Sequence, residues 1–177
     1  MKINIVLVEP EIPANTGNIS RTCSVTGSAL HLVHPLGFDI SEKQVRRAGL
    51  DYWDALDISE YSAFDEVLEK NKNAEFYYFS TKAGRKYSDI DYKRAADAGR
   101  DIFLVFGKET KGLPEELLHE HYEDCVRIPM LENMRSLNLS NAAAVAVYEV
   151  LRQLGFDGMQ SKGRLTRYPE PQIKQEG

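Results

Sequence analysis

The sequence predicts an α/β fold in which helices cover both faces of a mostly parallel β-sheet. Apolar strands alternate with helical segments along one short chain, which is the order that βαβ units require. The first strand, Ile3 to Glu9, is an almost continuous β-branched run, as expected for a strand buried on both faces of a parallel sheet. A chain of 177 residues is long enough for one domain with a core.

The remaining elements follow from local patterns. Prolines, Asn and Gly in PEIPANTGN interrupt the first strand, and helical spacing resumes from Ile19 to Val25. Further strands are expected at Ala29–Pro35, Glu75–Thr81, Asp101–Gly107 and Cys125–Met130, and further helices at 41–49, Tyr61–Lys70 and 140–154. In the last helix, Ser140 is the expected N-cap and Gly155 the expected stop.

The domain is expected to span residues 1–157. Beyond it the sequence loses its apolar periodicity, so residues 158–177 are predicted to form a flexible C-terminal tail.

Composition indicates a soluble globular protein, because 42% of the residues are apolar and 28% are charged. No segment has the roughly 18 uninterrupted apolar residues of a membrane span, and the N-terminus does not resemble a signal peptide. Cys23 and Cys125 are too few and too far apart for a disulfide framework. We therefore expect a cytoplasmic protein that does not contact membranes.

The net charge of −5 argues by itself against a protein that binds nucleic acid through its overall charge. Basic residues nevertheless cluster locally, as at Arg46 and Arg47 or at Lys108 and Lys111. Such clusters often mean only a solvated surface.

A glycine loop, LVFGKETKGLP, follows the strand that ends near Gly107. Gly107 and Gly112 have the spacing of a phosphate-binding P-loop, but Leu113 and Pro114 replace its lysine and its hydroxyl residue. A nucleoside triphosphate is therefore disfavoured. A Rossmann-type dehydrogenase is disfavoured too, because no G-x-G-x-x-G follows the first strand.

Three polar loops follow strands of the expected sheet. The first contains Asn15 and Arg21, the second is the glycine loop, and the third contains Ser136 and Asn138. Each could be only a turn or a helix cap. Together they indicate a site, because the carboxyl ends of parallel strands share one edge of the sheet.

The segments NTGNISR, FGKETKGLP and IPM followed by RSLNLSNAAAVAVYE resemble, in this order, the three motifs of the SPOUT methyltransferases. The chain is most similar to the minimal bacterial tRNA ribose 2′-O-methyltransferases that act on the wobble nucleotide. The resemblance implies an S-adenosyl-L-methionine (SAM) dependent enzyme, without a metal, that methylates the ribose of cytidine or modified uridine 34, with leucine tRNAs as substrates. It also implies a trefoil knot in the carboxyl half and a homodimer with active sites at the interface.

Two alternatives stay open. One is a 2′-O-methyltransferase for another tRNA or rRNA position, and the other is a regulator that binds SAM or RNA without turnover.

The resemblance also assigns roles to individual residues. Cofactor contacts are expected at Phe79, Gly107, Glu109, Gly112, Leu113, Ile128, Met130 and Ser136, catalytic roles at Arg21, Ser136 and Asn138, and RNA contacts at Asn15, Arg21, Arg46 and Arg47. Small glycines are expected to let the loop approach the cofactor closely. Because an arginine guanidinium holds its proton, Arg21 suits a phosphate grip better than a general base. Tyr148 is a candidate for either the dimer interface or the core.

The four histidines, His31, His34, His119 and His121, lie in a strand or an acidic segment. We interpret them as structural or solvated residues rather than as metal ligands.

Overall fold

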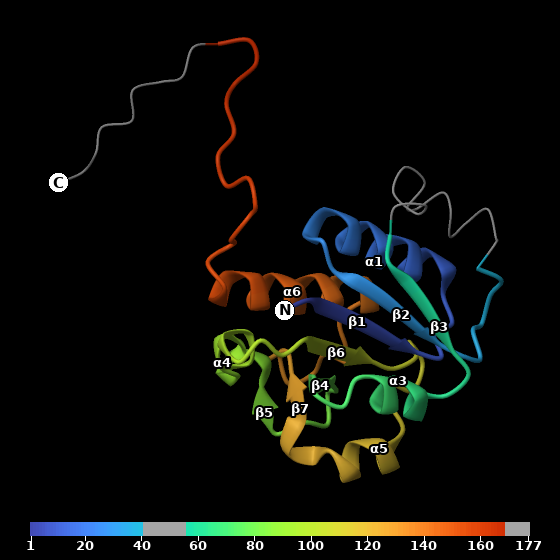
Figure 1. Ribbon diagram of the computed structural model, residues 1–177. Coiled ribbons are helices and arrows are strands. Elements are labelled where there is room, and N and C mark those ends of the chain that lie inside the picture. The colour runs from blue at the N-terminus through green and yellow to red at the C-terminus, as the bar shows by residue number, and fades with distance from the viewer. Residues whose placement is uncertain (41–55, 169–177) are drawn as a thin grey trace.

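The computed structural model describes residues 1–40 and 56–168. Its centre is a seven-stranded sheet of order β3-β2-β1-β6-β4-β7-β5, in which neighbouring strands are parallel (Figure 1). The strands are β1 (Ile3–Val8), β2 (Ala29–Val33), β3 (Ile58–Tyr61), β4 (Glu75–Phe79), β5 (Arg85–Lys86), β6 (Ile102–Phe106) and β7 (Cys125–Arg127). The predicted parallel sheet is confirmed.

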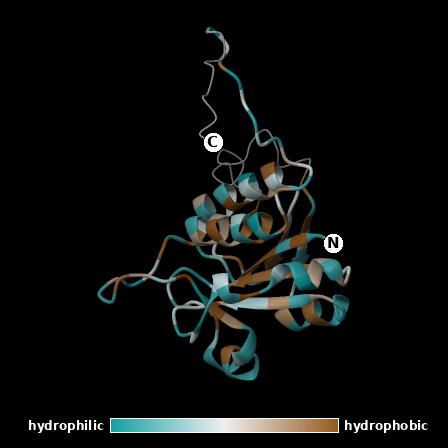
Figure 2. Ribbon diagram, turned by 90° about the vertical axis from the view of Figure 1, so that its left-hand side faces the viewer, coloured by the Kyte–Doolittle hydropathy of each residue, from teal (hydrophilic) through white to brown (hydrophobic). Residues whose placement is uncertain are grey.

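Helices cover both faces of the sheet, as predicted. The helices are α1 (Pro13–Thr26), α3 (Phe64–Lys70), α4 (Tyr92–Asp97), α5 (Glu115–Glu120) and α6 (Leu139–Gln153), with short 3₁₀ turns at Tyr87–Asp89 and Tyr122–Asp124. Helices α1, α4 and α6 pack into one core layer, and α3 and α5 pack into the other. Figure 2 shows the central strands as largely apolar and the helices as a mixture of apolar and polar residues.

The central strands are buried on both faces because their side chains alternate between the two cores. In β1, Ile5 and Leu7 join the layer under α1 and α6, whereas Val6 and Val8 join the layer under α3 and α5. All six residues of β1 are buried, which explains the continuous apolar run in the sequence.

The first helix begins earlier than predicted. Helix α1 starts at Pro13 rather than near Ile19, so Asn15, Gly17 and Asn18 lie inside the helix and not in a turn before it. Proline is favoured in the first turn, where its missing N–H costs no hydrogen bond. The asparagines and glycine misled the prediction because they are weak helix formers.

Three further boundaries differ from the prediction. Tyr61 ends β3, which was not predicted, and the helix expected from Tyr61 begins only at Phe64. Strand β7 ends at Arg127 rather than at Met130. The N-cap of α6 is Asn138 and not Ser140, because the Asn138 side chain accepts the backbone N–H groups of residues 140 and 141.

The stop after α6 is close to the prediction. The helix ends at Gln153, and Gly155 adopts a left-handed φ of 73° while its N–H group bonds to the carbonyl of Arg152.

The helix expected at 41–49 lies outside the described residues. Residues 160–168 are exposed and form neither a helix nor a strand. The trefoil knot stays a prediction. None of the helices in residues 1–40 and 56–168 has the length and apolar content needed to cross a membrane.

Candidate active site

A cavity of about 570 Å³ opens at the carboxyl ends of β4, β6 and β7. Its wall combines the start of α1, residues 79–82, the loop of residues 106–113 and the segment of residues 128–139. The eight residues that the motifs assign to the cofactor, from Phe79 to Ser136, all line it. The volume lies within the roughly 300–1,000 Å³ that small-molecule sites occupy.

The glycine loop, residues 107–113, folds back on itself. The Gly112 N–H donates to the carbonyl oxygen of Lys108 at 2.8 Å, and Gly112 adopts a left-handed φ of 71°. A methyl group on Gly107 would lie 2.1 Å from the carbonyl carbon of Gly112 and 2.2 Å from the nitrogen of Leu113. Gly107 is therefore required by the backbone of the loop itself. That the glycines also let the loop approach the cofactor closely stays a prediction.

Glu109 links the glycine loop to the first helix. Its carboxylate accepts hydrogen bonds from the backbone N–H groups of Glu11 at 2.8 Å and Ile12 at 3.2 Å, and from the Asn15 amide at 3.0 Å. The N-cap residue, Ile12, has no side chain that could cap α1, so a carboxylate 97 residues away supplies the negative charge there. Glu109 lines the cavity with its carboxylate already engaged in these contacts.

Asn15 continues this link to the third loop. The Asn138 amide donates to Asn15 Oδ1 at 2.9 Å, and Asn138 Oδ1 accepts from the Ser140 hydroxyl at 2.7 Å. Asn15 is 5% exposed, so its bonds to Glu109 and Asn138 satisfy a buried amide. A series of hydrogen bonds thus joins all three predicted loops at one wall of the cavity.

Ser136 also lines the cavity, from the exposed segment that precedes α6. Arg21 does not line it. Arg21 lies on the exposed side of α1, six residues beyond Asn15, which corresponds to about 9 Å along a helix axis. It forms no ion pair with any described residue. Arg46 and Arg47 lie outside the described residues.

Basic side chains surround the cavity although the protein is acidic overall. Lys82, Lys108, Lys111 and Arg135 all line it. Lys82 pairs with Glu115, and Lys108 pairs with Glu9 at 2.5 Å, which raises the pKa of Lys108. Neighbouring carboxylates therefore neutralise Lys82 and Lys108, and Lys111 and Arg135 are the lining cations without an ion pair among the residues that the structure describes.

Sequence reasoning missed the contribution of Thr110. Its backbone N–H and its hydroxyl both donate to Glu11 Oε2, at 3.1 and 2.7 Å, and the hydroxyl contact lowers the pKa of Glu11. The two residues lie 99 positions apart, so no local pattern could have paired them.

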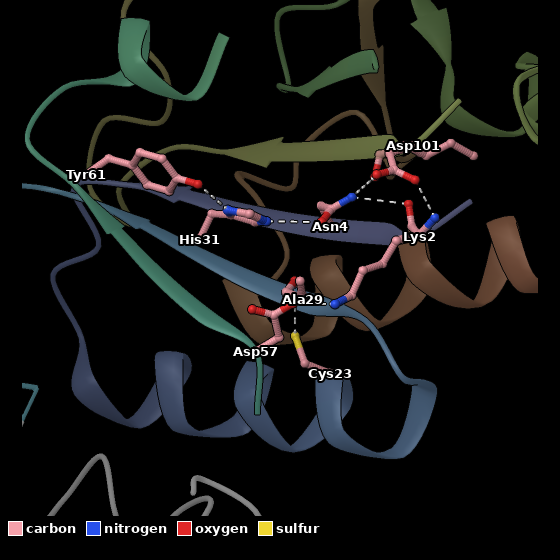
Figure 3. Close-up of polar contacts among 9 residues, drawn as sticks. Lys2, Asn4, Cys23, Ala29, His31, Asp57, Tyr61 and Asp101 are labelled. Atoms are coloured by element: carbon pink, nitrogen blue, oxygen red, sulfur yellow. Dashed lines mark hydrogen bonds and ion pairs between the residues drawn. The ribbon is translucent and has the colours of Figure 1, made fainter. Parts of the chain in front are cut away.

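His31 and His34 both bond to residues of neighbouring strands. His31 is buried between Asn4 Oδ1 and the Tyr61 hydroxyl, each at 3.0 Å (Figure 3). His34 pairs with Glu60 at 2.8 Å. Within residues 1–40 and 56–168, no three His, Cys, Asp or Glu side chains gather as metal ligands would.

Comparisons with known proteins match the chain to one family. The profile of the SpoU rRNA Methylase family matches residues 2–148. The chain is 52% identical to a Geobacillus stearothermophilus protein that is provisionally assigned as a tRNA (cytidine(34)-2′-O)-methyltransferase, over 90% of this chain and 99% of that protein.

Two solved structures extend the likeness to the fold. One, described as giving structural insights into the 2-OH methylation of C/U34 on tRNA, has a TM-score of 0.80 and 38% identity, and the match covers 88% of this chain and 97% of that one. The other is an AdoMet-bound rRNA methyltransferase from Sinorhizobium meliloti, with a TM-score of 0.75 and 26% identity over 86% of this chain and 57% of that one. The chain therefore belongs to the SpoU rRNA Methylase family.

Proposed function

We propose that the protein is a SAM-dependent methyltransferase that modifies the ribose 2′-hydroxyl of nucleotide 34 in tRNA, a cytidine or a modified uridine, with leucine tRNAs as substrates. One observation carries the proposal: the three motif loops meet in one cavity, and every residue that the motifs assign to the cofactor lines it. The names of the similar proteins support tRNA nucleotide 34 as the target.

The cavity fits SAM in size and in chemistry. Phe79, Leu113 and Ile128 provide apolar contacts for an adenosine, while the backbone of the glycine loop offers hydrogen-bonding groups. When bound there, SAM would supply the methyl group, which its sulfonium carries. We propose that the transfer of this methyl group needs no metal. The S. meliloti relative was solved with this cofactor, which supports the same assignment here.

Asn138 and Ser136 are proposed to position the ribose. In-line transfer requires the 2′-oxygen to be held in one orientation. Asn138 is well suited to this because Asn15 and the start of α6 fix its amide. Ser136 lines the cavity two residues away.

Arg21 is proposed to grip the phosphate beside the target nucleotide and to stabilise the oxygen as its proton leaves. A guanidinium does not accept that proton, so the RNA phosphate is the proposed acceptor. Arg46 and Arg47 are proposed as further RNA contacts, and Asn15, whose buried amide bonds to Glu109 and Asn138, is proposed to act on the RNA through the loops that it holds.

Arg21 lies at some distance from the cavity along α1, and a homodimer would account for this. Helices α1 and α6 pack side by side on one face of the sheet (Figure 1). On their outer sides Val25, Val145 and Tyr148 are 53%, 38% and 44% exposed. We propose that a second copy covers this surface and that the active sites lie at the interface, near Arg21. We further propose residues 1–157 as the catalytic domain, residues 158–177 as a flexible tail, and the cytoplasm as the site of action.

Methylation of purified tRNA tests the function. The protein, SAM and unmodified leucine tRNA should give one ribose methyl group, which mass mapping should locate at nucleotide 34. Methylation at another position would support a different RNA methyltransferase. Binding of S-adenosylhomocysteine without methylation of any tRNA or rRNA would support a regulator.

A further inference from the structure

Two turns of the chain interlock beside the cavity. Glu109, in the glycine loop, accepts the backbone N–H of Glu11 at 2.8 Å. In return, Glu11 accepts the backbone N–H of Thr110 at 3.1 Å and its hydroxyl at 2.7 Å. Each turn thus presents one carboxylate to a backbone N–H of the other. The middle of the glycine loop is therefore held by the turn after β1.

The backbone of the turn at Glu11 packs closely against Gly37. A methyl group on Gly37 would lie 2.8 Å from Glu11 Cα and 2.9 Å from the Glu11 carbonyl oxygen. The Gly37 N–H also donates to the carbonyl of Pro10 at 2.9 Å. The turn after β1 cannot move away from the glycine loop without disturbing residue 37. Glu11 therefore offers Thr110 a fixed anchor rather than a mobile surface carboxylate.

We propose that Glu11 and Thr110 are positioning residues for the cofactor, which act by holding the glycine loop in the shape that lines the cavity. Thr110 is exposed and lies at the cavity wall, between Glu109 and Lys111. Without its anchor, the loop would keep the Lys108–Gly112 bond, the Lys108–Glu9 pair and the Glu109 contacts, but the Thr110 side chain would lose its partner. The free loop would then sample other shapes, and the cofactor would have to select the competent one. This inference rests on the proposed binding of SAM in this cavity.

Calorimetric titration with S-adenosylhomocysteine tests the proposal without requiring turnover. Thr110→Val keeps the shape of the side chain but removes the hydroxyl donor, so its dissociation constant should rise about five- to tenfold, as expected for losing one typical hydrogen bond at a solvent-exposed position. Thr110→Ser keeps the hydroxyl and should bind like the unmodified protein. Ser62→Ala is the matched control, because it removes a hydroxyl donor to a carboxylate, that of Glu66, and Ser62 does not line the cavity.

Two further measurements separate positioning from general destabilisation. The melting temperature of Thr110→Val should stay close to that of Thr110→Ser, and its kcat at saturating SAM should be unchanged while KM for SAM rises. In addition, Glu11→Ala combined with Thr110→Val should weaken binding no more than Glu11→Ala alone, because Glu11→Ala already removes the acceptor of both the Thr110 hydroxyl and its backbone N–H.

The outcomes distinguish the two proposals. If the unmodified protein does not bind S-adenosylhomocysteine, the proposed function fails. If the unmodified protein binds S-adenosylhomocysteine, and Thr110→Val and Glu11→Ala bind it as tightly as the unmodified protein does, the positioning role is wrong. Equal weakening in Thr110→Ser and Thr110→Val would also overturn the role, because the hydroxyl would then be irrelevant.

Discussion

Asn138 donates a hydrogen bond to Asn15 at 2.9 Å, although 123 positions separate the two residues in the chain. The contact joins the start of α6 to the start of α1. Asn15 also donates to Glu109, so hydrogen bonds join the third loop, before α6, to the glycine loop. The same Asn138 side chain caps α6, so one residue serves both the stability of a helix and the geometry of the cavity.

These two roles of Asn138 can be separated by substitution. Asn138→Ala removes the cap and should lower the free energy of unfolding by about 1 kcal/mol. Asn138→Asp keeps an acceptor for the cap but loses the amide donor to the buried Asn15, so any loss of stability there comes from that contact and not from the cap, and methyl transfer should be lost. Urea unfolding beside single-turnover methylation gives both quantities. Ser140→Ala is the control, and a larger loss of stability there would contradict the assignment of the cap to Asn138.

Gly107→Ala should disrupt the glycine loop. The added methyl group would overlap the backbone of residues 112 and 113, which can move only if the loop opens. We expect a lower melting temperature together with loss of S-adenosylhomocysteine binding. Gly163→Ala is the control, because no atom lies within 4 Å of the added carbon there. A Gly107→Ala protein with normal stability and weakened binding would contradict the disruption of the loop and would indicate that this glycine makes room for the cofactor.

Much of the fold could be predicted because it depends on local patterns. The runs in β1 and β6 are apolar on both faces, and neither strand needs a distant partner to be recognised. The start of α1 was missed because weak helix formers follow Pro13, the local signal of a first turn. The carboxylate that stabilises this helix end belongs to Glu109, far away in sequence. Strand β5 has two residues and no pattern.

The site followed the same division. The motifs identified residues that line the cavity, but they said nothing of how the loops hold one another. Thr110 carried no signal because its partner, Glu11, lies far away in sequence and belongs to another turn. Contacts of this kind become visible only once the sheet has brought the loops to one edge.

Stability should depend on pH through His31. Asn4 donates its amide hydrogens to the carbonyls of Lys2 and Ile102, so Asn4 Oδ1 accepts from His31 Nε2–H. Burial lowers the pKa of His31 to about 4, from an ordinary value of 6.5. Between these values the unfolded chain binds a proton that the folded protein does not. The contribution of His31 to the free energy of unfolding is therefore fully present above pH 6.5. It falls as the pH drops towards 4, by up to about 3 kcal/mol.

Urea unfolding at several pH values checks this dependence. His31→Gln should lower stability at neutral pH but flatten the change between pH 6.5 and 4 relative to the unmodified protein. His119→Gln, which alters an exposed ring, should leave the change as it was. Parallel pH curves for the unmodified protein and His31→Gln would show that His31 is not the responsible group.

The proposed homodimer should be visible in solution. Light scattering at micromolar concentration should give twice the 20.1 kDa of one chain. Tyr148→Glu places a charge on the outer side of α6 and should shift the mass towards one chain, since a buried unpaired charge is costly. Lys72→Glu, at an exposed position outside this surface, should not. A fully active protein with the mass of one chain would disprove the interface.

Arg21 offers a test that separates RNA positioning from cofactor binding. It is exposed on α1 and absent from the cavity wall, so Arg21→Ala should leave the affinity for S-adenosylhomocysteine unchanged. If its guanidinium stabilises the reacting ribose and phosphate, methyl transfer should fall by about 10²–10³. Arg21→Lys should restore little, because one ammonium cannot replace the two parallel contacts of a planar guanidinium. Arg100→Ala, another exposed arginine, is the control. A joint loss of cofactor binding and transfer in Arg21→Ala would mean that Arg21 supports the structure of α1 and not the reaction, because only a change in the helix could then reach the cavity.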